Sequence, residues 1–361
     1  MKALIAMSGG VDSSVAAGIM IEKGYECTGC MMKLFDVLDV AGDEESFRDE
    51  KTCCSFDDAV DARNVAARLN MPFYVLNFKD EFKEKVIDHF VRSYESGTTP
   101  NPCIECNKYL KFGKLYEKAK ELGCDTIVTG HYARIEKSGE EYVLKKAKEP
   151  SKDQSYVLYG MTQELLKHTV FPLGDMSKDE TRAIAESKGF INSNKPDSQD
   201  ICFVPDGDYA SVVEKYSKNK PQTGDFVYKD GTVLGKHKGI IHYTIGQRKG
   251  LNISFSKPLY VCDICPSECR IMLGDNEDLF KDTFEASEVN WISSKKPAGK
   301  LRCSAKVRYR HKEEPGELEF LDNDTVRFVF DEKQRAITPG QAAVFYDGDI
   351  VLGGGVIKSI N

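Results

Sequence analysis

The chain has 361 residues, of which 41% are hydrophobic and 30% charged, and its formal net charge is −7. This length exceeds what one hydrophobic core usually organises, so we expect two or three domains. No apolar run is long enough to cross a bilayer, which argues against a membrane protein and against a membrane partner. The first residues lead straight into an apolar strand without a signal peptide, so we expect a cytoplasmic protein.

Positive charges gather in short segments although the chain is acidic overall. The segments are 108–114, 145–148, 236–249, 295–302 and 308–312. An ordinary solvated surface explains each one alone, but five together are compatible with a polyanionic partner, because the location of charge matters more than its sum. Without an export signal, the 12 cysteines are expected to be reduced thiols used for catalysis or metal binding rather than a disulfide framework.

The segment Ser8 to Ser14, SGGVDSS, follows an apolar run and precedes a helical pattern over 15–23. A strand that breaks at two glycines and restarts as a helix exposes backbone N–H groups and a positive helix end, so it can bind an anion. The segment has neither the Walker A nor the dinucleotide-binding pattern. It resembles the SGGxDS pyrophosphate loop of enzymes that adenylate a substrate, in which Asp12 would face the nucleotide through a metal ion. The simpler interpretation is a glycine turn in which Asp12 or Ser13 only caps the helix.

Strands and helices alternate after this loop. We expect strands at 26–34, 73–78 and 126–129, with helices from about 55 to 69 and 80 to 94. This alternation predicts a parallel α/β sheet. Ligands of such sheets bind at the carboxyl ends of the strands, so Gly130 should lie beside the phosphate loop.

The segment Thr98 to Asn107 contains two prolines and the thiols Cys103 and Cys106. Because proline disrupts a regular helix, we expect a loop here and a helix that starts at Lys108. A helix start just after Cys106 would lower the pKa of that thiol and so favour the reactive thiolate. The alternative for the two cysteines is half of a structural zinc site.

In the rest of the chain, the sequence pattern changes from alternating helices and strands to strands. A hairpin is expected to turn at Ser138-Gly139, and a capping box at Ser177 and Glu180 starts a helix that ends near Lys188. From residue 225 short alternating runs predict β structure, and strands expected at 305–309, 325–330, 342–345 and 350–357 indicate a closed barrel. We therefore divide the chain into domains over 1–205, 206–274 and 275–361.

Six segments in this order resemble the tRNA-specific 2-thiouridylase (MnmA) family, and they are 8–14, 99–112, 129–132, 152–156, 197–203 and 244–250. The likeness runs the whole length of the chain. It implies an ATP-pyrophosphatase catalytic domain with a parallel sheet, a small central β-rich domain and a C-terminal β-barrel that contacts tRNA. It also implies an enzyme that uses ATP with Mg²⁺ to thiolate the wobble uridine of tRNA.

The resemblance assigns roles to individual residues. Cys106 matches the nucleophile and Cys202 the cysteine that carries a persulfide, and the two would form a transient disulfide. ATP contacts are implied at Ala6, Met7, Ser8, Gly9, Gly10, Val11, Asp12, Ser13, Met32 and Gly130. Contacts with the target base are implied at Asn101, Pro102 and Cys103, and contacts with tRNA at His131, Lys152, Asp153, Gln154, Arg308, Tyr309 and Gln341. From its position before a helical segment, Asp153 has the simpler interpretation of a helix cap.

The expected reaction turns the uridine O2 into a leaving group. O2 attacks ATP, and pyrophosphate leaves while backbone donors and Mg²⁺ hold it. The persulfide on Cys202 then attacks the activated carbon, and Cys106 resolves the product by forming the disulfide. A sulfur donor, such as a cysteine desulfurase or a sulfur-relay protein, and a reductant are therefore expected partners.

One position departs from the family pattern. Many members carry an aspartate where this chain has Cys103, so the acid–base role of that aspartate has no obvious successor here. Cys103, Cys106 and Cys202 could instead hold an iron–sulfur cluster with one iron left open. We prefer the persulfide route, because the nucleophile and persulfide positions match directly. Another group of cysteines is left unassigned: Cys53, Cys54, Cys262, Cys265 and Cys269.

Two other functions compete with thiolation. A pyrophosphate-loop ATP ligase for a small metabolite would need neither Cys202 nor the C-terminal barrel nor the basic segments. A non-catalytic RNA-binding protein with a structural metal would use the loop only to sense ATP. Release of AMP that depends on tRNA would distinguish a tRNA-thiolating enzyme from these alternatives.

Overall fold

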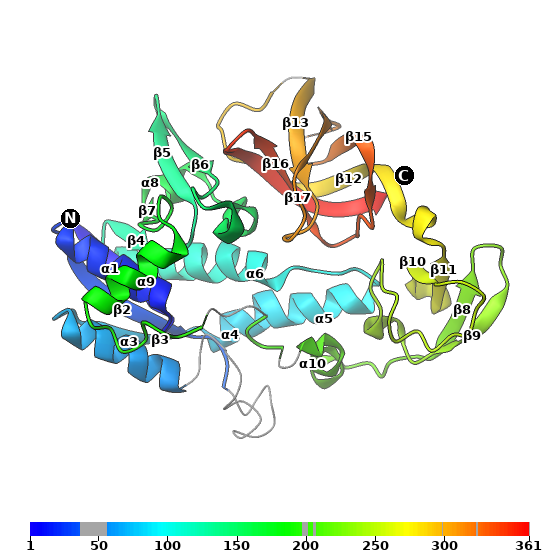
Figure 1. Cartoon of the computed structure of the whole chain (residues 1–361), viewed down its shortest axis with the longest axis horizontal. Helices are drawn as coiled ribbons and strands as arrows, with labels where there is room; N and C mark the ends of the chain where they lie inside the picture. The colour runs from blue at the N-terminus through cyan, green and yellow to red at the C-terminus, as the bar shows by residue number, and fades with distance from the viewer. Residues whose placement is uncertain (37–55, 197–200, 205–206, 298, 323, 361) are drawn as a thin grey trace.

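The computed structural model describes residues 1–36, 56–196, 201–204, 207–297, 299–322 and 324–360 (Figure 1). Cys53, Cys54 and the first four residues of the segment 197–203 lie outside the described residues. Cys202 lies within them.

The N-terminal domain is built on a five-stranded parallel sheet with the order β3-β2-β1-β4-β7. Its strands are β1 (Lys2–Ala6), β2 (Glu26–Lys33), β3 (Phe73–Asn77), β4 (Thr126–Val128) and β7 (Thr169–Val170). The central strands β1 and β4 are apolar because both of their faces are covered, as is usual for parallel sheets. The predicted parallel α/β sheet is confirmed.

Helices form a separate hydrophobic core on each face of this sheet. One core contains α1 (Val11–Glu22), α3 (Phe56–Arg68) and α9 (Lys178–Ser187). The other contains the continuous helical stretch α4 (Lys79–Phe82), η1 (Lys83–Ile87) and α5 (Asp88–Glu95), together with α10 (Tyr209–Tyr216). The capping box that the sequence predicts at Ser177 and Glu180 is present at the start of α9.

The helix that carries the two cysteines begins earlier than the sequence suggests. It runs without a break through α6 (Pro102–Glu105), the π-helical η2 (Cys106–Lys114) and α7 (Leu115–Glu121). The prediction of a loop up to Asn107 was therefore wrong. Pro102 occupies the first helical position, where its missing N–H costs nothing, and Asn101 caps the helix. Cys103 and Cys106 lie in the first turns of this helix.

The two C-terminal domains are built from strands, as predicted. The central domain has a four-stranded sheet with the order β10-β11-β8-β9, formed by β8 (Gly224–Tyr228), β9 (Val233–His237), β10 (Tyr260–Cys265) and β11 (Arg270–Gly274). The barrel contains β12 (Phe280–Trp291), β13 (Lys300–Lys306), β14 (Glu314–Phe320), β15 (Val326–Arg335), β16 (Ala342–Asp347) and β17 (Ile350–Ile360). Pairing of β12 with β17 closes it.

A hairpin of the N-terminal domain extends the sheet of the barrel. The hairpin strands are β5 (Arg134–Ser138) and β6 (Glu141–Lys145), and β6 pairs with β17. A hydrophobic core shared by the two domains lies below this junction and includes Tyr156 and Val344. In Figure 1 the barrel sits between the N-terminal sheet and the central domain, above α5 and α6. Among the described residues, no helix is long and apolar enough to span a membrane.

Candidate active site

The predicted phosphate loop joins β1 to α1 and is held closely against α3. Gly9 has a φ of +77°, and a Cβ at this position would lie 2.4 Å from the main-chain oxygen of Asp58. Only glycine fits both the conformation and the space. The Ser13 hydroxyl accepts a hydrogen bond from the Ser8 amide at 3.2 Å, so the loop is closed by its own side chains.

Asn192 is a loop-holding residue that the sequence did not indicate. Its side chain is buried, and its Nδ2 donates to the Gly9 carbonyl and to the Ser14 hydroxyl, both at 2.9 Å. It comes from the segment after α9, far from the loop in the sequence. No local pattern identifies such a contact, because an asparagine between turn residues is ordinary.

Asp12 lies at the start of α1 and faces two polar groups from other elements. Its Oδ1 accepts from the Tyr132 hydroxyl at 2.9 Å and from the Lys178 ammonium at 2.7 Å. Lys178 is buried, whereas the Asp12 side chain is 31% exposed. Both contacts fall on Oδ1, and no hydrogen bond within the described part of the chain uses Oδ2. A carboxylate oxygen on a partly exposed side chain is the ligand type that Mg²⁺ prefers, so the loop fits this ion.

Gly130 lies beside the loop, as its place after β4 predicts. A Cβ at Gly130 would come within 2.8 Å of the main chain of both Asp12 and Ser13. Other residues of the expected ATP set have different environments: Met7 and Val11 are buried, while Ala6 and Met32 are partly buried. Their contacts with ATP stay predictions.

Cys103 and Cys106 differ in exposure although they lie on one helix. Cys103 is exposed, and its amide donates to the Asn101 side chain at 3.1 Å. Cys106 is partly buried where the helix widens to π geometry, a distortion often found at functional sites. The sequence predicts a helix N-terminus directly after Cys106, where its positive end would lower the pKa of that thiol. In the structure the helix begins at Pro102, before Cys103, so its positive end lies farther from Cys106 than expected.

Cys202 lies on the same hydrophobic core as Cys106. Both cysteines pack against the cluster that contains Phe82, Phe90 and Phe203. The fold thus brings to one core two thiols that are far apart in the sequence. Within the described residues, no three His, Cys, Asp or Glu side chains lie close enough to hold a metal ion. The structure therefore gives no support to a cluster at Cys103, Cys106 and Cys202, or to a metal site at Cys262, Cys265 and Cys269.

Several residues expected at the tRNA have internal contacts. His131 is 7% exposed, and its Nδ1 lies 2.7 Å from the Thr129 hydroxyl. Burial lowers the pKa of His131 well below its ordinary value, so the ring is neutral. Gln154 exchanges hydrogen bonds with the main chain of Tyr132, at 2.9 Å in each direction.

Asp153 also binds the main chain of its own domain. Its carboxylate accepts from the amides of Ala147 and Ser155 and from the Ser155 hydroxyl. This geometry agrees with the simpler interpretation of Asp153 as a cap of the following turn. A contact of tRNA with His131, Lys152, Asp153 or Gln154 stays a prediction.

The C-terminal barrel holds the segment before Cys103. Gln341 donates to the Thr99 carbonyl at 2.8 Å, and the Thr99 amide donates to the Pro339 carbonyl at 2.9 Å. Arg308 reaches the central domain, donating to the Ile245 carbonyl at 3.2 Å. Tyr309, by contrast, is exposed.

Glu105 is a further charged residue next to Cys106 that the sequence did not single out. Burial raises the pKa of Glu105, although His89 and Lys108 favour its charged form. Glu288 of the barrel faces it and adds to the increase. A glutamate in a helical pattern normally indicates a solvated face, so the sequence gives no local signal for the partial burial of Glu105.

Comparison with known proteins agrees with this architecture. Residues 1–206 match the family model "tRNA methyl transferase HUP domain", residues 210–275 "tRNA methyl transferase PRC-barrel domain", and residues 281–357 "Aminomethyltransferase beta-barrel domain". A Clostridioides difficile (strain 630) protein named tRNA-specific 2-thiouridylase MnmA is 53% identical over 359 residues, which cover 99% of this chain and 98% of that protein. The chain belongs to the MnmA family.

Other members of the MnmA family are also similar along their whole length. The Clostridium kluyveri protein of the same name is 46% identical over 358 residues, with 99% of each chain covered. A solved 4-thiouridine synthetase in complex with RNA and ATP is 16% identical, with a TM-score of 0.34 over 57% of this chain and 45% of that chain. This last likeness is too remote to bear on function.

Proposed function

We propose that this protein is an ATP-dependent tRNA-uridine 2-sulfurtransferase that thiolates the wobble uridine. The observation that carries the proposal is the full-length identity of 53% with a tRNA-specific 2-thiouridylase. The geometry adds support, because the loop at Asp12 and the two thiols Cys106 and Cys202 belong to one domain.

The loop would bind the phosphates of ATP. Its backbone N–H groups and the positive end of α1 attract anionic oxygens, and Gly130 leaves room for the loop at the end of β4. Lys178 and Tyr132 both bind Oδ1 of Asp12, and among the described residues Oδ2 has no hydrogen bond. Mg²⁺ bound there would neutralise charge on the departing pyrophosphate.

The reaction would then proceed in two stages. The uridine loses its N3 proton as O2 forms a bond to the α-phosphorus of ATP, and pyrophosphate leaves. The terminal sulfur of a Cys202 persulfide attacks C2, and AMP leaves with the original oxygen. The Cys106 thiolate attacks the Cys202 sulfur, which releases 2-thiouridine and leaves a Cys106–Cys202 disulfide. A two-electron reductant restores both thiols.

The barrel would orient the tRNA relative to these groups. It holds the segment before Cys103 through Gln341, and it presents the exposed Tyr309 next to a basic loop. Stacking of a base on an exposed ring is a common way to bind an unpaired nucleotide.

The test is release of AMP and pyrophosphate by the purified protein, with tRNA, ATP, a cysteine desulfurase and cysteine. We expect tRNA-dependent release of both and formation of 2-thiouridine, detected by mass spectrometry of nucleosides. Asp12→Ala should abolish pyrophosphate release but retain tRNA binding, whereas Asp179→Ala, at an exposed position near Lys178, should behave like the parent. Release of AMP without tRNA would favour a small-molecule ligase instead.

A further inference from the structure

Lys306 is a half-buried lysine at the end of β13, beside the exposed Tyr309. Its ammonium lies 5.7 Å from the ring centres of both Tyr156 and Tyr309. Burial lowers the pKa of Lys306, although Asp153 and Glu313 oppose this effect. A cation in such a place normally pairs with a carboxylate, because burial without a partner is costly.

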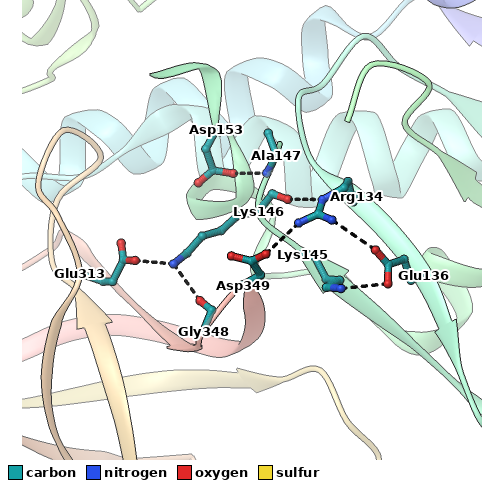
Figure 2. Close-up of polar contacts among 9 residues, drawn as sticks. All are labelled: Arg134, Glu136, Lys145, Lys146, Ala147, Asp153, Glu313, Gly348 and Asp349. Carbon is teal, nitrogen blue, oxygen red and sulfur yellow. Dashed lines mark hydrogen bonds and ion pairs between the residues drawn. The ribbon is translucent and has the colours of Figure 1, made fainter. Parts of the chain in front are cut away.

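The two nearby carboxylates are occupied by other donors. Figure 2 shows Asp153 bound to the Ala147 amide and Glu313 bound to the Lys146 ammonium. Within the described residues, the Lys306 ammonium makes no hydrogen bond and no ion pair, only its two ring contacts. Its three N–H donors are thus available to a ligand.

Lys146 keeps Glu313 in this position through the hairpin that extends the barrel sheet. Besides binding Glu313, Lys146 donates to the Gly348 carbonyl at 2.8 Å. Arg134 fixes the same strand, donating to the Lys146 carbonyl at 2.7 Å and pairing with Asp349 at 3.1 Å (Figure 2). Glu313 is therefore held by the N-terminal domain and makes no ion pair with Lys306 within the described residues.

Arg308, two residues after Lys306, is a further basic side chain, but its guanidinium has partners within the protein. Its guanidinium donates to Ile245 and to the Thr338 hydroxyl, and burial lowers its pKa. Tyr309, in contrast, keeps 39% of its surface exposed, and its partial burial and then the neighbouring Asp153 and Cys103 raise the pKa of its hydroxyl. Tyr309 is thus a common neighbour of Lys306 and of Cys103, the thiol expected at the target base.

We propose that Lys306 binds a phosphate oxygen of tRNA next to the target nucleotide, and that Lys146 preserves this site by holding Glu313. The proposal rests on the proposed function. A lysine with unused donors beside an exposed aromatic ring suits a nucleotide whose base stacks on the ring and whose phosphate meets the ammonium.

The first experiment measures equilibrium binding of tRNA to Lys306→Met over a range of salt concentrations. Loss of one phosphate contact should reduce the slope of log K against log salt by about 0.7 to 0.9 and weaken binding about five- to eightfold at 0.1 M salt. Lys306→Arg should restore the slope, and Lys358→Met, an exposed lysine of the same barrel, should not change it. The Kd for ATP without tRNA should be unchanged. An unaltered slope in folded Lys306→Met would overturn the proposal.

The second experiment tests the role of Lys146. Lys146→Met should free Glu313 to pair with Lys306 and so weaken tRNA binding, and adding Glu313→Gln should restore the affinity. Lys145→Met is the matched control, because its ion pair with Glu136 stays inside the hairpin. Equal affinities for Lys146→Met and the parent would contradict the role of Lys146. Failure of the proposed function itself would appear separately, as a parent protein that neither binds nor thiolates tRNA.

Discussion

Gly130 lies directly against the main chain of Asp12, so closely that a Cβ at position 130 would meet it at 2.8 Å. The contact joins the end of β4 to the phosphate loop that follows β1. These strands are neighbours in the sheet, and the loop is therefore supported by the adjacent strand as well as by its own glycines.

Gly130→Ala should displace the loop. Overpacking of this kind costs about 1–3 kcal/mol, so we expect ATP binding to weaken about tenfold or more. The measurement is the Kd of ATP by titration calorimetry. Gly160→Ala is the control, because a Cβ there would lie 4.0 Å from the Lys108 side chain, an ordinary van der Waals distance. Normal ATP binding by folded Gly130→Ala would show that the loop does not bind the nucleotide.

Asn192→Ala should loosen the loop and its attachment to the first turn of α1. It removes two hydrogen bonds and leaves the Gly9 carbonyl without this donor, at a cost of about 1–3 kcal/mol. We expect a lower unfolding free energy and a higher KM for ATP. Asn194→Ala, at an exposed position two residues away, should alter neither quantity. If both variants behave alike, Asn192 is not a support of the loop.

The three cysteines should differ in their effect on thiolation. Cys106→Ser and Cys202→Ser should abolish formation of 2-thiouridine, because each removes one partner of the disulfide. Cys103→Ala and Cys103→Asp should retain measurable activity, since the exposed Cys103 is not part of that pair. The assay uses aerobic, iron-free protein supplied with a cysteine desulfurase.

A different set of results would show that the cysteines bind an iron–sulfur cluster. In that case neither the iron-free parent nor Cys103→Asp would turn over. Anaerobic addition of iron and sulfide would restore activity to the parent alone. These two results together would assign all three cysteines to a cluster.

His131 should make the unfolding free energy depend on pH. Burial keeps it neutral in the folded state, whereas in the unfolded chain it binds a proton below about pH 6.5. The unfolded state therefore gains protons as the pH falls, and stability decreases by an amount that approaches about 1.4 kcal/mol per pH unit below 6.5.

His131→Gln removes this titration while keeping a polar group near Thr129. Denaturant unfolding at pH 7.5 and pH 5.5 should show a smaller loss of stability in the variant than in the parent. Equal losses would mean that His131 is solvated and titrates normally in the folded protein.

Much of the fold could be predicted because local sequence patterns determine its elements. The apolar strand before Ser8, the two glycines and the capping box at Ser177 each act over a few residues, and the structure contains all three elements. The prediction of the helix start at Lys108 was wrong for a local reason too. Proline was taken as a breaker, but Pro102 stands at the one helical position that tolerates it, with Asn101 as its cap.

The sequence by itself determined the phosphate loop, the order of α/β and β domains and the family, because short-range periodicity and contiguous motifs carry that information. The reactivity of Cys106 and Cys202 stays a prediction. Only the tertiary structure decided which side chains complete the sites. Lys178 reaches Asp12, Asn192 reaches Gly9, and Lys146 binds Glu313. Each of these contacts joins residues far apart in the chain. Burial and unused hydrogen-bond donors are properties of such assembled surroundings, and no single segment encodes them.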